Sequence, residues 1–268
     1  MRRWRWRSFA LLGLMVSLSA PGCGPPVAEQ SNRQGPGHRS QPLALTPEQE
    51  LELGQRASQE VLAEYRDRIL PADRPEVKRA RGIAGRIVRA VEIRPLQREI
   101  NLHVEGYQNE WKLNVLRSDK VNAFALPGGK IFVFTGILQV VQNDDQLATV
   151  LSHEIAHVLA HHASERIARE RPGIVGMLEG FKYDRKQESE ADHIGVFLMT
   201  FAGFNPEEAV RFWQRMQRLS ENRGHLLDFL SDHPSDAQRI HDLQAWVPRA
   251  EAAKRAYEHG HIQPEPAP

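Results

Sequence analysis

The sequence predicts an α+β fold that is mainly helical and contains one small antiparallel sheet. Apolar residues recur at three- and four-residue spacing over most of residues 46–257, which is the period of a helix. Between residues 99 and 134 the period changes to two, as in strands, and Pro127-Gly128-Gly129 gives a turn signal there. The 268 residues are 41% hydrophobic and 26% charged, which suits one globular domain with disordered ends.

The N-terminus has the pattern of an export signal over residues 1–23. Residues 1–7 hold four arginines and no acid, and residues 9–18 are apolar but short of the roughly 20 residues that span a bilayer. Cys23 is the only cysteine and follows Gly22, as an acylated cysteine does in bacterial lipoprotein signals. We therefore expect lipidation at Cys23, with ordinary signal cleavage or an uncleaved anchor as the alternatives.

This leader predicts the compartment and narrows the partners. We expect an exported protein of the periplasm or cell envelope, attached to a membrane as a lipoprotein. Without the four leader arginines, the 35 basic residues fall to 31 against 34 acidic ones, a net charge of −3, so no nucleic-acid partner is expected. With no second cysteine, the mature fold depends on its core and not on disulfides.

The segments after the leader divide into a tether and two helices. Residues 24–45 are rich in Pro, Gly, Gln and Ser, which predicts a disordered tether. Thr46-Pro47-Glu48 supplies a cap, a first-turn proline and an acid for a helix towards residue 70. A second helix is expected over residues 75–93, and both are interpreted as packing helices.

The strands come next, at residues 100–104, 111–115, 121–126 and 131–134. The third of them contains Asn122, Ala123, Phe124 and Ala125. An edge strand offers unpaired backbone groups to an extended polypeptide, so these four residues form a candidate substrate edge. An internal strand is the alternative.

Helices fill the rest of the chain, at about residues 135–141, 144–171, 183–201, 205–219, 235–246 and 249–257. No internal repeat is visible. We predict a catalytic domain over residues 46–247, followed by a C-terminal helix and a Pro-rich tail over residues 248–268.

The helix after residue 144 carries the clearest chemical motif. His153 and His157 are four residues apart, so their imidazoles emerge on one helix face, and Glu154 adjoins them. Two imidazoles can occupy two corners of a zinc tetrahedron while the carboxylate reaches a water at an open corner. Chance spacing on a solvated helix is the alternative, but the apolar residues around this H-E-x-x-H pattern indicate a buried helix.

The third ligand must come from another helix. His161 lies eight residues from His153, about 12 Å along the axis, so it cannot reach the same ion on a straight helix. Residues 160 and 163 are both alanine, which excludes the Gly and His that follow the motif in metzincins. His161 and His162 are therefore interpreted as solvated residues or as neighbours of the ligands.

An acidic cluster downstream offers the missing carboxylate. Glu188 and Asp192 are four residues apart and share a helix face, so Glu188 can bind zinc while Asp192 accepts the outer N–H of a ligating histidine. Two acids on a solvated face, and Glu190 as the ligand, remain the alternatives.

Taken together, these motifs resemble metallopeptidase family 48, the HtpX and CAAX-prenyl-protease type of gluzincin, a zincin-like fold. The resemblance covers residues 46–245 and implies that His153, His157 and Glu188 bind one zinc ion and that Glu154 is the catalytic base. It also implies that residues 122–125 lie beside the substrate, and it matches His233 and Arg239 to a late histidine and arginine. The chain lacks the several membrane spans of those branches and looks more like the compact exported bacterial members. The motifs that carry the resemblance are Asn122 to Gly129, Phe134-Thr135-Gly136, His153 to His157, Glu188 to Asp192 and His233-Pro234-Ser235 with Arg239.

The roles of His233 and Arg239 stay open at this point. Either can stabilise the oxyanion of a peptide-cleavage intermediate, and His233 can instead close the zinc site as a fourth ligand. A turn residue and a helix-surface cation are the alternatives for the two residues.

The expected function is a zinc endopeptidase of the bacterial envelope that cleaves misfolded or unassembled exported proteins. Its partners would be unfolded or extended polypeptides and, through Cys23, a membrane. The alternative is a holdase or assembly factor that uses the same groove around a latent zinc site.

Overall fold

The structure is a computed structural model that describes residues 41–102, 104, 106–170, 183–223, 228–233 and 237–260. The predicted signal, most of the predicted tether and Cys23 lie outside these residues. Within them no helix is long and apolar enough to cross a membrane. The elements are α1 (Pro47–Glu64), η2 (Arg66–Arg68), α2 (Pro75–Val91), α3 (Arg94–Glu99), β1 (Lys112–Leu116), β2 (Ala123–Leu126), η3 (Pro127–Gly129), β3 (Lys130–Phe134), α4 (Thr135–Val140), α5 (Asp144–Leu159), α6 (His162–Glu170), α8 (Arg185–Phe201), α9 (Glu207–Arg223), α10 (Asp228–Asp232) and α11 (Ala237–Glu258).

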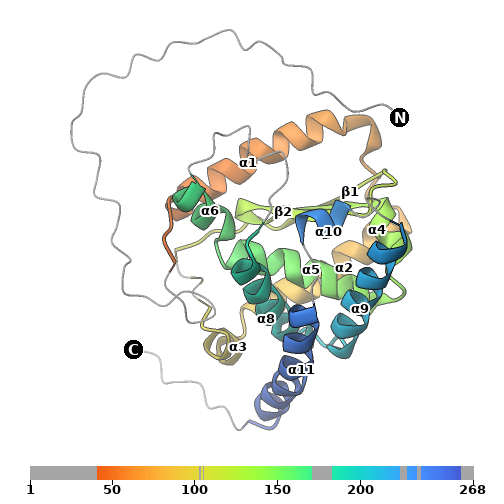
Figure 1. The fold of residues 1–268 in the computed structure, drawn as a ribbon. Helices are drawn as coiled ribbons and strands as arrows, with labels where there is room; N and C mark the ends of the chain where they lie inside the picture. The colour runs from red at the N-terminus through yellow and green to blue at the C-terminus, as the bar shows by residue number, and fades with distance from the viewer. Residues whose placement is uncertain are drawn as a thin grey trace, which may run out of the picture.

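The fold is a layered α+β arrangement, as the sequence predicts. Helix α1 lies along one face of a three-stranded sheet, and α5 lies below the other face together with α2 (Figure 1). Period-two alternation produces the two faces. Phe132 and Phe134 of β3 pack with α1, whereas Ile131 and Val133 belong to the larger core that contains α5.

The sheet is mixed and not wholly antiparallel. Its strand order is β1-β3-β2, and β3 pairs antiparallel with β2 but parallel with β1. The chain crosses from β1 to β2 before the tight turn at η3 returns it as β3, and this crossover places β1 alongside β3 in the same direction. Among the described strands β2 therefore lies at an edge, with Ala123 and Ala125 on the face towards α5.

The strand predicted at residues 100–104 is wrong. Pro95 lies in the first turn of helix α3, where its fixed φ suits a helix, and Ile100 caps that helix. Asn101 then takes a positive φ of 49°, which turns the chain. Ile100 and Leu102 are buried as expected, but from a helix end and a turn and not from a strand.

Two helix boundaries also differ from expectation. The helix predicted over residues 144–171 does not continue to residue 171: α5 ends at Leu159, His161 has φ 54°, and α6 begins at His162. The helices predicted at residues 235–246 and 249–257 form one helix, α11, that contains Pro248. The spacing of apolar residues alone predicts neither the break after Leu159 nor the continuous helix α11.

Candidate metal centre

The helix that carries the H-E-x-x-H motif is buried along its length. Asn143 caps α5 by accepting a hydrogen bond from the Gln146 N–H, and Asp144 and Asp145 place negative charge in the first turn, where it is favourable. Every residue from Gln146 to Leu159 is buried. The motif therefore lies inside the protein, and its polar groups need partners there.

Helix α8 crosses α5 and supplies the acidic residues. Asp184 begins α8 with a capping box to Gln187, which satisfies backbone N–H groups of the first turn. Gly195 allows a close approach, since a Cβ there would lie 3.2 Å from the backbone nitrogen of His153. The crossing brings Glu188 and Asp192, both buried, against the two motif histidines.

Four side chains converge on one point: His153, His157, Glu188 and His233 each offer a ligand atom within 4.8 Å of the others. His153 Nε2 lies 3.0 Å from His157 Nε2 and 3.1 Å from His233 Nδ1. The Glu188 carboxylate oxygens lie 3.4, 3.5 and 3.0 Å from the ring nitrogens of His153, His157 and His233, respectively. Ligands about 2.0 to 2.1 Å from a tetrahedral zinc ion lie about 3.3 Å from one another, so the separations fit zinc.

The electrostatics of this cluster also suit a cation. Burial disfavours a charged His153, yet Asp192 and Glu188 overcome that effect and raise its pKa. Burial alone would raise the pKa of Glu188, but His233 and Arg239 hold that pKa well below its ordinary value. The site therefore keeps a carboxylate ionised beside three imidazole nitrogens, a donor set that zinc prefers.

Glu154 lies beside the cluster. Its Oε2 accepts a hydrogen bond of 3.1 Å from the backbone N–H of Ala125 in β2, and its Oε1 lies 3.2 Å from His233 Nε2. Burial raises the pKa of Glu154 to about 7, against the opposing effect of His233. A carboxyl group with such a pKa can both accept and return a proton near neutral pH.

Asp192 and Arg239 form a support behind the ligands. Asp192 Oδ1 lies 3.0 Å from His153 Nδ1, and Arg239 donates to both oxygens of Asp192 at 2.7 and 2.9 Å. Arg239 also lies 2.8 Å from Glu188 Oε2 and packs over the Trp213 ring. Arg239 is buried, so the interpretation of a helix-surface cation is wrong; the turn-residue interpretation of His233 is likewise incomplete, because His233 is buried against the cluster.

Two further residues, His162 and Glu190, lie beside the cluster, although the sequence left His162 as either solvated or a neighbour of the ligands and considered Glu190 only as an alternative ligand. His162 is fully buried with its Nδ1 2.7 Å from His157 Nδ1, and its Nε2 lies 3.0 Å from Glu190 Oε2. The adjacent histidines 161 and 162 were a signal, but a straight helix would point His162 elsewhere. The left-handed residue His161, which cannot be read from spacing, redirects it.

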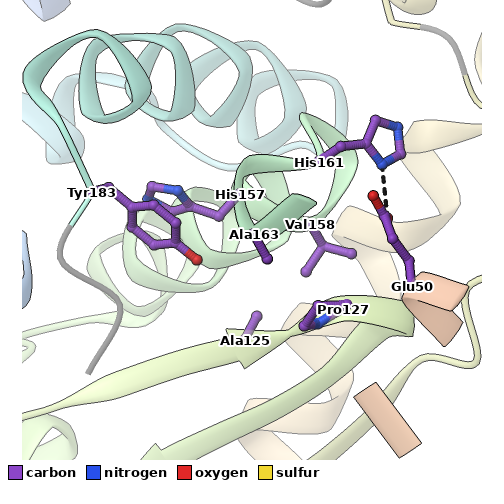
Figure 2. A pocket seen from close by; sticks show the side chains of 8 residues that line it. All are labelled: Glu50, Ala125, Pro127, His157, Val158, His161, Ala163 and Tyr183. Carbon is purple, nitrogen blue, oxygen red and sulfur yellow. Dashed lines mark hydrogen bonds and ion pairs between the residues drawn. The ribbon is translucent and has the colours of Figure 1, made fainter. Parts of the chain in front are cut away.

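A small pocket opens next to the cluster (Figure 2). The Tyr183 ring stacks on His157 at one side, with centroids 3.8 Å apart, and Glu50 pairs with His161 at the other. Ala125 and Pro127 line it from the sheet side. The pocket thus connects His157 of the cluster on α5 with the edge strand β2.

The family model described as "Peptidase family M48" matches residues 89–181 and 172–247, which include every residue of the cluster. The chain belongs to peptidase family M48. The predicted resemblance is therefore confirmed, as is the predicted zincin-like fold class. M48 metalloproteases use zinc, in agreement with the donor set described above.

Individual M48 relatives extend the comparison. The chain is 36% identical over 225 residues to "Mitochondrial metalloendopeptidase OMA1" of Schizosaccharomyces pombe, covering 76% of this chain and 63% of the relative. It is 33% identical to the protein of that name in Saccharomyces cerevisiae, covering 79% and 66%. It is 24% identical to the "Beta-barrel assembly-enhancing protease" of Escherichia coli, covering 53% and 35%. The chain thus spans less than two thirds of the length of these relatives.

The M48 relatives contradict the predicted localisation. The two yeast mitochondrial metalloendopeptidases match 76% and 79% of this chain at 36% and 33% identity, against 53% at 24% identity for the Escherichia coli protease, so the assignment to a bacterial periplasm or cell envelope is wrong. An Arg-rich leader without acidic residues is compatible with an export signal and with a mitochondrial transit peptide, so its composition alone does not decide the compartment. A lipid anchor at Cys23 gains no support, and Cys23 lies outside the described residues.

Proposed function

We propose that this chain is a zinc-dependent endopeptidase in which His153, His157 and Glu188 hold one zinc ion. The single observation that carries this proposal is the meeting of these three ligand atoms beside the Glu154 carboxylate. Bound there, zinc would polarise a peptide carbonyl and lower the pKa of a water molecule towards about 7.

The proton transfers are assigned to Glu154. Its carboxylate takes a proton from the attacking water and gives it to the leaving amine as the peptide bond breaks. The raised pKa of about 7 supports both steps, because a group with this pKa is neither too weak as a base nor too weak as an acid. Arg239 keeps Glu188 and Asp192 ionised, and we assign it this supporting role in preference to direct contact with the oxyanion.

The proposed substrate is an extended polypeptide that adds a strand to β2 at residues 122–125. Ala125 donates its backbone N–H to Glu154, on the side away from β3. A substrate strand pairing there would take over this donor and release Glu154 for catalysis. Extended segments are exposed in misfolded or unassembled proteins, so we propose protein quality control as the role.

The test compares the 268-residue chain with its Glu154→Gln variant on casein and on a peptide library. The variant should keep the fold and one zinc ion per chain but lose cleavage by about 10²- to 10⁴-fold, because an amide cannot accept the water proton. Full cleavage by the variant would eliminate the proposed mechanism. A zinc-free wild type that still cleaves would eliminate the metal.

The position of His233 favours a second function, that of a holdase or assembly factor with a latent site. Its Nδ1 takes the fourth corner of the cluster, and closed four-ligand sites are typical of structural zinc. Helix α10 holds it there: the Phe229 N–H donates to Val121 O, and Asn122 donates to Asp232 Oδ2. In this state α10 occupies the start of the β2 edge.

One measurement separates the two functions. If binding alone is the function, Glu154→Gln should suppress the aggregation of an unfolded client as well as the wild type does, and neither form should cleave it. Cleavage by the wild type alone assigns the groove to proteolysis, with His233 moving aside when substrate binds.

A further inference from the structure

The turn between α5 and α6 contains a residue with a left-handed backbone conformation. His161 is not glycine, yet it has φ 54°, a left-handed conformation that costs an L-residue about 1 kcal/mol or more. The His161 side chain makes contacts on two sides. Nδ1 lies 3.0 Å from Glu50 Oε2 of α1, and the ring stacks on Tyr107 with centroids 3.7 Å apart. Contacts from two distant segments thus stabilise a strained turn.

The effect of this turn is to bring His162 back onto α5. Five residues along an uninterrupted helix rotate a side chain by about 140°, away from His157. After the turn, His162 Nδ1 instead lies 2.7 Å from His157 Nδ1. On its other side, His162 Nε2 lies 3.0 Å from Glu190 Oε2 of α8, and the His162 ring is fully buried.

Proton placement in this chain of groups has one consistent solution. His157 directs Nε2 into the ligand cluster, so as a neutral zinc ligand it carries its proton on Nδ1. Among the described residues, the partner of that N–H is His162 Nδ1, which must then be the acceptor nitrogen. His162 therefore carries its proton on Nε2 and donates it to the Glu190 carboxylate.

We propose that His162 and Glu190 form a positioning relay that fixes the tautomer and orientation of His157 for zinc. The inference rests on the proposed function, because it assigns His157 as a zinc ligand. Neither residue touches the ligand cluster's centre, and both act through His157.

The relay makes the two motif histidines unequal. His153 Nδ1 lies 3.0 Å from a carboxylate oxygen of Asp192, whereas His157 reaches a carboxylate only through the imidazole of His162. A direct carboxylate partner pushes more electron density onto a ligating imidazole than a neutral acceptor does. The two contacts thus orient both imidazoles. Because the relayed contact gives His157 less electron density, a bound metal would keep more positive charge than it would with two direct carboxylate contacts.

The first test measures zinc dissociation constants by competition with a chromophoric chelator on the 268-residue chain. His162→Phe keeps the ring volume but removes both nitrogens, and it should weaken zinc binding by about 10- to 100-fold. His162→Asn keeps an acceptor at the position of Nδ1 and should recover most of that loss. The control is His241→Phe, whose side chain is 75% exposed and whose zinc affinity should not change.

The second test needs no variant and so does not depend on how well one folds. Long-range ¹H–¹⁵N spectra of the histidine-labelled, zinc-loaded wild type should show His157 protonated on Nδ1 and His162 protonated on Nε2. The reverse tautomer of His162 would overturn the relay, because its Nδ1 could then no longer accept from His157.

These outcomes separate the relay from the proposed function. Tight zinc binding by the wild type with an equal affinity in His162→Phe overturns the relay alone. No zinc binding by the wild type overturns the proposed function and the relay together. Loss in His162→Phe with recovery in His162→Asn supports both.

Discussion

Asp192 is the residue whose contacts were best anticipated by spacing. It lies one helical turn after Glu188, contacts His153 Nδ1 at 3.0 Å and is itself held by Arg239. Replacing it with alanine should weaken zinc retention by about 10- to 100-fold, because His153 loses the acceptor that fixes its tautomer. Zinc remaining after dialysis against a graded series of chelator concentrations measures this loss.

Two comparisons make that measurement specific. Asp67→Ala removes a carboxylate that is 86% exposed, and it should retain zinc like the wild type. Asp192→Asn keeps an acceptor oxygen for His153 and should fall between the two. If Asp192→Ala keeps its zinc as firmly as Asp67→Ala does, Asp192 has no part in holding the ligand.

At the scale of single residues, helix periodicity predicts which side chains share a helix face. It does not predict a turn that depends on one backbone dihedral angle. The four-residue spacings of His153 with His157 and of Glu188 with Asp192 place each pair on one face, and the structure brings both pairs together. His162 and Glu190 meet only because His161 takes a positive φ, stabilised by residues more than 50 positions away, Glu50 and Tyr107. Spacing contains no information about that turn.

At the scale of elements, the contact of α1 with the turn after β2 depends on one glycine. A Cβ added at Gly54 would lie 1.7 Å from the backbone oxygen of Pro127, which belongs to the turn that also lines the pocket. Backbone cannot yield as a flexible side chain does, so Gly54→Ala should lower the free energy of unfolding by about 1 to 3 kcal/mol. Urea unfolding followed by circular dichroism provides the measurement.

The matched control is the same substitution in the interior of another helix. Nothing lies within 4 Å of a Cβ at Gly82 of α2, so Gly82→Ala should raise the free energy of unfolding by about 0.4 to 1 kcal/mol through helix propensity. Equal effects of the two substitutions would show that α1 does not pack on the turn as described.

Element types were predicted more reliably than strand pairing. The helices that carry the ligands and the strands β2 and β3 follow from the period of their apolar residues. The failure at residues 100–104 arose because alternating apolar residues also occur where a helix end and a turn are both buried. The parallel pairing of β1 with β3 depends on the crossover between β1 and β2, and strand sequences alone do not specify it.

For the whole molecule, the metal is expected to link parts of the chain that are otherwise joined only by packing. The ligand atoms come from α5, α8 and the residue after α10. Zinc at about 1,000 times its dissociation constant adds about 4 kcal/mol of stability, so EDTA should lower the melting temperature by roughly 10 °C. Differential scanning fluorimetry measures the shift, and added zinc but not magnesium should reverse it.

An unchanged melting temperature after verified zinc removal would mean that the cluster is held by packing alone. The result also bears on His233: if it is a fourth ligand, zinc removal should increase proteolytic nicking near α10 along with the loss of stability. The melting temperature and the rate of nicking together test whether zinc bound at the cluster stabilises the whole domain.

The central claim is that one zinc ion is bound where α8 crosses α5. Zinc-edge X-ray absorption of the 268-residue chain and of its Glu188→Ala variant tests it most directly. We predict one zinc per chain with nitrogen and oxygen ligands at about 2.0 to 2.1 Å, and a loss of most of that zinc in Glu188→Ala. Equal zinc content with unchanged coordination in Glu188→Ala would contradict the account.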